Sequence, residues 1–250
     1  MRTDLQRVTP LTDPNYTVRL SGFASACWPQ FMLHDPVADE LWEHLGNEFG
    51  AFQMALFDAD GAPAAMLNSV PLHWDSPLAK LPDEGWDFAM RQAVNGLLNG
   101  QTPNMLCAIQ VAIHPRYRGS GLSTVMLQEM RKIAAAHGFG RLIAPVRPSE
   151  KALHPKVPME EYIRWVRPDG MPADAWLRVH VRAGASIIKV APRSMEISGS
   201  LQEWRSWTNL PFDTDGEVLV PGALSPVQVD LAKQRAVYLE PNVWMCHELK

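Results

Sequence analysis

The most regular pattern of hydrophobic and polar positions lies near the middle of the chain, in residues 106–146. Residues 106–113 form an almost continuous apolar run rich in β-branched side chains, which is typical of a strand buried on both faces. Beyond a glycine-containing turn, apolar residues recur every three or four positions, as on the buried face of a helix. These residues are Leu122, Met126, Met130 and Ile133. Gly138 ends the predicted helix and residues 142–145 begin a second buried strand, so the pattern predicts a β-α-β unit.

The residues before this unit predict a strand, a helix and a hairpin. Residues 1–15 are polar and are expected to be a loose lead-in, and residues 16–20 alternate like a strand. Asp35 and Pro36 have N-cap and N1 chemistry for an amphipathic helix that reaches Gly50. Its apolar positions are Val37, Leu41, Leu45 and Phe49. Two apolar runs, 51–57 and 64–70, flank an Asp-Ala-Asp-Gly turn and predict a hairpin.

Two long segments flank the β-α-β unit. Residues 75–103 contain a predicted helix at 85–98, and residues 147–172 carry five prolines. A proline-rich segment of that length in a compact domain is more typical of a packed functional loop than of a slack connection. Residues 173–183 predict the next helix, which Gly184 turns into a strand.

The tail from about residue 201 is expected to be rich in strands. A short helix is predicted at 200–208, followed by strands at 217–220, 227–231, 237–239 and 243–247. The last two are predicted as separate strands because Pro241 lies between them.

Composition narrows the class of protein. With 250 residues, 46% of them hydrophobic, the chain can bury a sizeable core in one large domain or two small ones. A net charge of −4 gives no general affinity for nucleic acid or anionic membranes, and neither a signal peptide nor an apolar run of membrane-spanning length is present. Three widely spaced cysteines and eight histidines without metal-ligand spacing predict a reduced, cytoplasmic protein without a metal site.

The turn at residues 118–123 reads Arg-Gly-Ser-Gly-Leu-Ser and opens the central helix. A helix that begins at a glycine turn brings together unpaired backbone N–H groups and the positive end of its dipole, which favours a phosphate ligand. A Walker loop would need a Lys-Ser or Lys-Thr pair after its second glycine, and the dinucleotide fingerprint would need a third glycine. Neither is present. A tight turn that binds nothing is the alternative.

This turn resembles motif A of the GNAT superfamily, the acyl-CoA-dependent N-acyltransferases. In that motif a strand ends near a proline and is followed by Arg/Gln-x-x-Gly-x-Gly/Ala at the start of the helix. Here Pro115 precedes Arg118-x-x-Gly121-x-Ser123. Serine stands where the family prefers glycine or alanine, and a small hydroxyl residue is also a good N-cap.

The resemblance implies a single α/β (α+β) domain over residues 1–250. Its central sheet would be mixed, mostly antiparallel and splayed near the end of the motif-A strand, with helices on both faces. Segments 75–103 and 147–172 would be insertions that form walls of the acceptor pocket, or else surface decoration or a dimer contact. The tail from about residue 201 would extend the sheet, pack on the acceptor side or form a subunit contact.

The resemblance also implies transfer of an acetyl group from acetyl-CoA to a primary amine by direct attack in a ternary complex. Backbone N–H groups of the turn would hold the pyrophosphate, Arg118 would add charge-assisted bonds, and the motif-A strand would template the pantetheine and supply an oxyanion donor. The residues assigned to CoA are Val111, Ile113, Arg118, Gly119, Ser120, Gly121, Leu122, Ser123 and Thr124. An inactive CoA-binding module, or an enzyme for a longer acyl-CoA, are the alternatives.

The sequence says least about which residues transfer protons in the reaction. The helix at 173–183 resembles GNAT motif B, in which a tyrosine four residues before the glycine often acts as general acid to the CoA thiolate. His180 holds that place here, so it is the candidate catalytic residue, with helix packing as its other role. An alkylamine with a pKa near ~10 also needs a base. The candidates, none of them preferred, are His73, His114, Glu160, Glu161 and Glu240.

The acceptor is expected to be a small-molecule or peptide amine, without nucleic acid or membrane partners and with a possible homodimer. Four tryptophans are candidates for an aromatic acceptor pocket or for the core. They are Trp165, Trp176, Trp204 and Trp207. Cys107 lies in a predicted buried strand without a histidine partner, so covalent catalysis is not expected.

Overall fold

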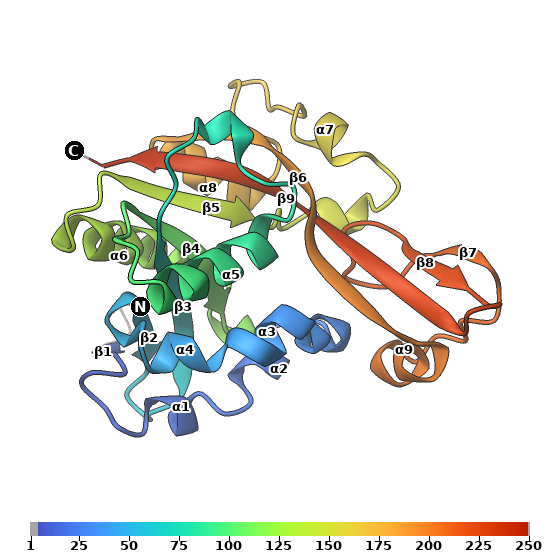
Figure 1. Cartoon of the computed structure of the whole chain (residues 1–250), viewed down its shortest axis with the longest axis horizontal. Coiled ribbons are helices and arrows are strands. Elements are labelled where there is room, and N and C mark those ends of the chain that lie inside the picture. Colours follow the sequence, from blue (N-terminus) through green and yellow to red (C-terminus); the bar gives the residue numbers. More distant parts are fainter. Residues whose placement is uncertain (1–4, 250) are drawn as a thin grey trace.

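A nine-stranded sheet runs through the computed structural model, which describes residues 5–249 (Figure 1). The strand order is β1-β2-β3-β4-β5-β9-β8-β7, and β6 pairs with β9. The strands are β1 (Gln6–Val8), β2 (Gln53–Phe57), β3 (Pro63–Leu72), β4 (Met105–Ile113), β5 (Arg141–Val146), β6 (Ala185–Ser200), β7 (Gly216–Val218), β8 (Val227–Asp230) and β9 (Arg235–Glu248). All neighbouring strands are antiparallel except β4 and β5.

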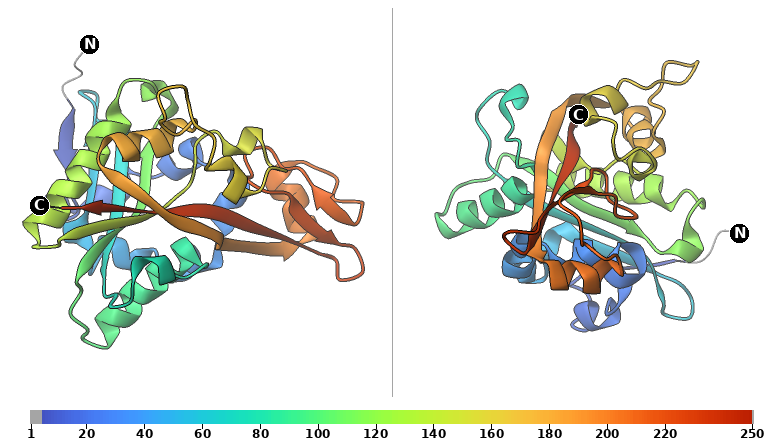
Figure 2. Two further views of the ribbon diagram at one scale, coloured as in Figure 1. Left: turned by 90° about the horizontal axis from the view of Figure 1, so that it is seen from above. Right: turned by 90° about the vertical axis from the view of Figure 1, so that its right-hand side faces the viewer.

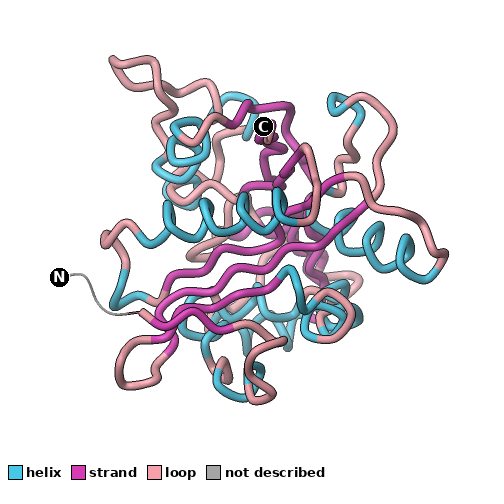
Figure 3. Tube along the Cα trace, turned by 90° about the vertical axis from the view of Figure 1, so that its left-hand side faces the viewer, coloured by secondary structure: helices cyan, strands magenta, loops and turns pink. Residues whose placement is uncertain are grey.

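Helices cover both faces of the sheet (Figure 3). The α-helices are α1 (Tyr16–Arg19), α2 (Phe23–Cys27), α3 (Pro36–Leu41), α4 (Glu43–Gly46), α5 (Gly85–Leu98), α6 (Leu122–Ala136), α7 (Met159–Tyr162), α8 (Ala175–Arg182) and α9 (Leu201–Thr208). The 3-10 helices are η1 (Gln30–His34), η2 (Gly50–Phe52), η3 (Leu78–Lys80), η4 (Pro115–Tyr117) and η5 (Lys151–Leu153). One core joins α3, α4 and α5 to the sheet, and another joins α6 to it. The predicted mixed sheet with helices on both faces is confirmed.

The sheet splits where β4 and β5 meet. These parallel strands pair only through Leu106 with Leu142 and Cys107 with Ile143, and beyond this point they diverge. Each strand remains paired on its outer edge, β4 with β3 and β5 with β9. The predicted splay of the sheet is therefore present, and it leaves two strand edges facing one another.

The tail builds an arm on the long ribbon of β6 and β9 (Figure 2). The arm carries α9, β7 and β8 and has its own core, in which Trp204 and Tyr238 are fully buried. Phe31 of η1 belongs to the same core, and Gly222 approaches Pro29 so closely that a Cβ there would lie 2.8 Å from the proline ring. The tail therefore both extends the sheet and packs against the segment before α3.

The N-terminal predictions need two corrections. Residues 16–19 form helix α1 instead of a strand, and the first strand is Gln6–Val8 within the expected lead-in, whose residues 1–4 lie outside the described part. Alternation over five residues is too short to decide the element, and Tyr16 is buried by joining a cluster with Phe23 and Phe57. The predicted helix after Asp35 begins there as expected but divides into α3 and α4 at Trp42, and Gly50 starts η2 rather than ending a helix.

The two strands predicted on either side of Pro241 are one strand, β9. The partner strand β6 bulges at this point, because Ala191 pairs with Asn242 and Met195 pairs with Glu240 while the residues between them have no partner. Proline lacks a backbone N–H and is tolerated opposite a bulge. The bulge also brings Ser194 to within 2.6 Å of Asn242.

Candidate active site

A cavity of about 1000 Å³ occupies the gap between β4 and β5. On one side it is lined by the C-terminal half of β4, the turn before α6 and residues of α8. On the other side it is lined by the segment from α2 to α3, by Trp86 of α5, and by residues of β6, β9 and the loop around Gly222. Cavities of this size accommodate a cofactor-sized ligand together with a small second molecule.

The inner edge of β4 is free along the cavity. From Ala108 to Ile113 this edge faces away from β3 and no longer pairs with β5, so its backbone groups beyond Ile109 are open to a ligand that adds itself as a strand. Val111 and Ile113, both assigned to CoA from the sequence, lie on this stretch.

A β-bulge interrupts β4 at the point where the cavity begins. Ser69 pairs with Ala108 and Asn68 with Gln110, which leaves Ile109 as the extra residue. The indole Nε1 of Trp86 donates a hydrogen bond of 2.9 Å to the carbonyl oxygen of Ile109. Helix α5 thereby fixes the orientation of the peptide at the bulge.

The turn before α6 presents free backbone donors. Gly119 and Gly121 have φ angles of 77° and 84°, a left-handed conformation that glycine adopts without strain. Four turn residues line the cavity with backbone N–H groups that have no partner within residues 5–249: Gly119, Gly121, Leu122 and Ser123. The N–H groups of Ser120 and Thr124 are already bonded to the carbonyls of Tyr117 and Gly121, and these two residues do not line the cavity.

The N-cap of α6 is Gly121 and not Ser123, so the capping role considered for that serine is wrong. Ser123 is the second residue of the helix, where its backbone N–H is one of the free donors. Arg118 also lines the cavity, and its Nη2 reaches across to the carbonyl oxygen of Cys27 at 3.4 Å.

His180 of α8 borders the inner end of the cavity and is 2% exposed. Its Nδ1 lies 3.0 Å from Nε2 of His247 on β9, and its ring packs edge-on against Trp176. Burial, with a smaller contribution from His247, lowers the pKa of His180 to about 3. Burial and Arg131 lower the pKa of His247 to about 4. Both rings are therefore neutral at neutral pH, and Nε2 of His180 has no partner within the described residues.

Tryptophans and a few charged groups line the acceptor side. Trp28, Trp42 and Trp86 contribute indole rings, and the charged residues are Asp39, Arg147 and Glu240. The two predicted insertions both reach the cavity, the first through Trp86 and the second through Arg147 and its neighbours. Among the tryptophans singled out in the sequence, Trp176 lines the cavity.

The other three pack elsewhere. Trp165 contacts Tyr162 and His154, Trp204 is in the core of the arm, and Trp207 stacks on His34.

The five candidate bases are separated by the fold. Glu240 lines the cavity, and the other four do not. His73 contacts Asp75 and the carbonyl of Thr102, and the bond to Asp75 raises its pKa. His114 caps η4 by accepting a hydrogen bond from Arg116. Glu160 and Glu161 are exposed on α7.

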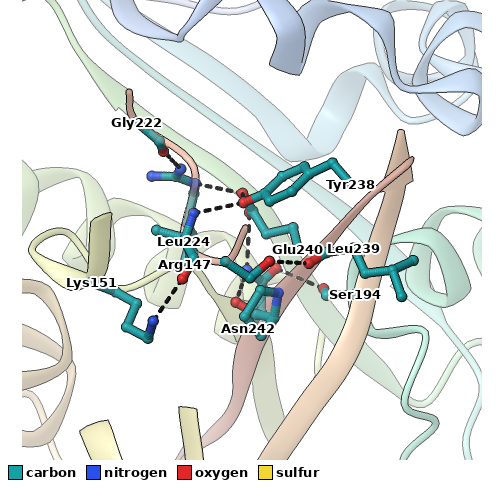
Figure 4. A network of polar contacts seen from close by, with 11 residues as sticks. Arg147, Lys151, Ser194, Gly222, Leu224, Tyr238, Leu239, Glu240 and Asn242 are labelled. Atoms are coloured by element: carbon teal, nitrogen blue, oxygen red, sulfur yellow. Dashed lines mark hydrogen bonds and ion pairs between the residues drawn. The ribbon is translucent and has the colours of Figure 1, made fainter. Parts of the chain in front are cut away.

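A buried polar network surrounds Glu240 (Figure 4). Arg147 Nε donates to Glu240 Oε2 at 2.9 Å, and the Tyr238 hydroxyl donates to the same oxygen at 3.0 Å. Asn242 Nδ2 donates to Glu240 Oε1 at 3.1 Å, and Ser194 Oγ donates to Asn242 Oδ1 at 2.6 Å. Sequence reasoning did not find Arg147 or Asn242, because they become neighbours only through the pairing of β5 and β6 with β9.

No group of three or more His, Cys, Asp or Glu side chains in residues 5–249 is placed to hold a metal ion. Within the same residues, none of the helices combines the length and the apolar character that crossing a membrane requires. Cys107 is buried, and burial raises the pKa of its thiol above the usual range.

The chain is similar to known proteins in both sequence and fold. The model of the acetyltransferase (GNAT) family matches residues 21–155. The chain is 35% identical over 252 residues to the arginine N-acetyltransferase avaD of Aspergillus versicolor, and the match covers 90% of this chain and 86% of that protein.

Two solved structures have a similar fold over nearly the whole chain. The loading GNATL domain of CurA from Lyngbya majuscula superposes with a TM-score of 0.62 at 15% identity, covering 100% of this chain and 98% of that one. The GNAT-like decarboxylase GphF, in complex with isobutyryl-CoA, gives a TM-score of 0.56 at 14% identity, covering 98% and 99%. At these identities the likeness concerns the fold alone.

Proposed function

This chain belongs to the acetyltransferase (GNAT) family, and we propose that the amine it acetylates is arginine or a derivative that keeps the guanidinium group. It is an acyl-CoA-dependent N-acetyltransferase. The single observation that carries the proposed acceptor is the 35% identity, over 90% of the chain, to an arginine N-acetyltransferase. That relative also favours an active enzyme over an inactive CoA-binding module.

The acceptor side of the cavity suits a cation with an extended side chain. Asp39 contributes a carboxylate, and three indole rings offer faces on which a guanidinium can stack. Apolar side chains between them, including Met32 and Met195, match the methylene groups of arginine.

For the donor, acetyl-CoA is proposed to lie along the free edge of β4 with its pyrophosphate at the turn before α6. The four free N–H groups of that turn and the positive end of the helix dipole match a phosphate, and Arg118 adds a cation. Val111 and Ile113 would pair with the pantetheine amides. Ser120 and Thr124 are proposed to shape the turn without touching the donor.

In the reaction, the neutral acceptor nitrogen attacks the thioester carbonyl carbon, the C–S bond breaks, the nitrogen loses a proton, and CoA leaves as a thiolate that takes up a proton. We propose that His180 assists this departure as a neutral hydrogen-bond donor, because its low pKa excludes a standing imidazolium at neutral pH. His180→Phe should lower kcat about tenfold while CoA affinity stays within about threefold. Unchanged kinetics would remove His180 from the mechanism.

The cytoplasm is proposed as the compartment of the enzyme. All three cysteines, Cys27, Cys107 and Cys246, are free thiols, which suits a reducing environment.

The acceptor proposal is tested by thiol release from acetyl-CoA over a panel of amines. Arginine is expected to exceed citrulline, its uncharged isostere, by about 100-fold in kcat/KM, because citrulline leaves the Asp39 carboxylate and the indole faces without their cation. Lysine and an arylalkylamine complete the panel, and mass spectrometry identifies the product. Efficient acetylation of the arylalkylamine without turnover of arginine would overturn the proposal.

A further inference from the structure

Arg147 is a guanidinium fixed at the wall of the cavity. It directly follows the last residue of β5, and its side chain is 18% exposed. Its Nε donates to Glu240, and its Nη2 donates to the carbonyl oxygen of Gly222 at 2.5 Å (Figure 4). Its charged end lies 5.9 Å from the ring centre of Trp28. Three separate segments therefore determine where this side chain points.

The groups that hold Arg147 are themselves held by buried neighbours. Glu240 is 1% exposed and accepts further bonds from Tyr238 and Asn242. The loop that offers the Gly222 carbonyl is fixed by Lys151, whose Nζ donates to the carbonyl of Leu224 at 2.6 Å. A satisfied network of this kind is rigid, and it sets the geometry of Arg147 at the wall of the cavity.

Arg147 lines the cavity and keeps N–H donors that have no partner within residues 5–249. An arginine has five N–H groups, and only Nε and Nη2 have partners within residues 5–249. Nη1 is not among the fully buried unpartnered atoms of the described residues. Glu240 already accepts three bonds, so this part of the wall offers donors rather than acceptors. A planar guanidinium with free N–H groups is suited to a carboxylate.

We propose that Arg147 binds the α-carboxylate of the acceptor, so that the acceptor is a free amino acid and not a decarboxylated or amidated amine. The inference rests on the proposed arginine-type acceptor. An acetyl group has no carboxylate, and the pyrophosphate of CoA is proposed to lie at the turn before α6, so the anion for Arg147 arrives with the acceptor. Arg147 is thus a specificity-determining residue for which the local sequence carries no signal.

The test compares arginine with agmatine, which lacks the carboxylate, and with argininamide, in which an uncharged amide replaces the carboxylate. The wild-type enzyme is expected to favour arginine by 30- to 100-fold in kcat/KM, the usual effect of a charge-assisted bidentate contact. Arg147→Met should remove this preference, because it lowers kcat/KM for arginine and leaves kcat/KM for agmatine within about threefold of the wild-type value. KM for acetyl-CoA should not change.

Arg141→Met is the matched control. Arg141 lies at the other end of β5 and pairs with Glu248 of β9, as Arg147 pairs with Glu240, but it does not line the cavity. Its removal should leave the arginine preference intact. Arg147→Lys, which keeps the charge but not the planar fork, should retain only part of the preference and protects the test against a Met variant that fails to fold.

Several results would overturn the proposal. Equal use of arginine and agmatine by the wild-type enzyme rejects the carboxylate contact on its own, while arginine-type acceptors stand. If Arg147→Met lowers kcat/KM equally for arginine and agmatine, Arg147 has only a structural role. If it raises KM for acetyl-CoA, Arg147 lies on the donor side. If no arginine-type compound is acetylated, the proposed function fails and this inference falls with it.

Discussion

The donor and acceptor sides of the cavity are built in opposite ways. The donor side comes from one continuous stretch, in which β4, the glycine turn and the start of α6 follow one another. The acceptor side comes from segments far apart in the chain, represented by Trp28, Trp86, Arg147 and Glu240. The first needs only a β-α-β unit to form, and the second needs the whole sheet to be complete.

The two sides also use different chemical groups. The donor side presents backbone N–H groups and a strand edge, which any sequence able to adopt the turn would supply. The acceptor side presents side chains whose directions depend on buried hydrogen bonds. Substitutions should therefore act on the donor side through charge and backbone conformation, and on the acceptor side through the network.

Glu240→Ala should give the largest effect, as a loss of stability. It leaves the guanidinium of Arg147 without its buried partner, and breaking such a pair costs about 3 kcal/mol or more. Glu248→Ala breaks the exposed pair with Arg141 on the same two strands and should stay within about 1 kcal/mol of wild type. Urea unfolding of both variants measures the difference, and equal losses would show that the acceptor network has no special structural weight.

Gly121→Asp should weaken CoA binding about 100-fold, because a carboxylate enters the site of the pyrophosphate. Space is not the limitation, since no atom lies within 4 Å of a Cβ built on Gly121. Its φ of 84° does strain any residue with a side chain.

Gly121→Asn is the control for that strain. It has nearly the shape of aspartate, tolerates the left-handed conformation and carries no charge. Calorimetry with CoA should find the asparagine variant within about tenfold of wild type. If both variants bind equally, charge at the turn is irrelevant and the phosphate assignment is wrong.

The same contrast explains what the sequence could predict. The β-α-β unit, the hairpin and α5 follow from local periodicity and turn chemistry, and their predicted bounds agree with β2 to α6 within a few residues. The GNAT fold followed because its motif lies within this continuous stretch. Residues 16–19 were predicted wrongly because a short alternating pattern does not determine the element when one buried tyrosine decides its packing.

The acceptor side was not predictable for a related reason. Arg147 and Glu240 are 93 positions apart and meet because β5 and β9 pair, and no local pattern encodes that meeting. The bulge in β6 that admits Pro241 and positions Ser194 against Asn242 also depends on the partner strand. Glu240 appeared only as one of five equal candidates, since neither its burial nor its partners can be read from neighbouring residues.

Acid should destabilise the protein through the pair formed by His180 and His247. Their folded pKa values of about 3 and about 4 lie below the unfolded value of 6.5, so the unfolded state binds more protons as pH falls. The stability of the neutral pair is present above the unfolded pKa of 6.5 and is lost progressively toward pH 4 for His247 and pH 3 for His180. At pH 5 each histidine accounts for a loss of about 2 kcal/mol.

His180→Phe isolates this contribution. Between pH 7 and pH 5, its free energy of unfolding should fall by about 2 kcal/mol less than that of wild type. Other groups with shifted pKa values, such as Asp87, are present in both proteins and cancel in the difference. Equal losses of unfolding free energy in the two proteins would mean that His180 is protonated in the folded state at pH 5. His180 could then act as a charged acid, and its assignment as a neutral donor would be wrong.

Thr124→Ala should give the smallest effect and is the finest test of the donor side. The motif suggests six successive turn residues as ligands, whereas in the structure the N–H of Thr124 already bonds to the carbonyl of Gly121 at 3.1 Å. Its side chain is exposed and does not line the cavity. CoA affinity should therefore change less than twofold, while Arg118→Gln, which removes a cation beside the phosphates, should weaken it about tenfold. A Thr124 effect as large as that of Arg118 would mean that side chains, and not only backbone groups, hold the donor, and the contrast between the two sides would no longer stand.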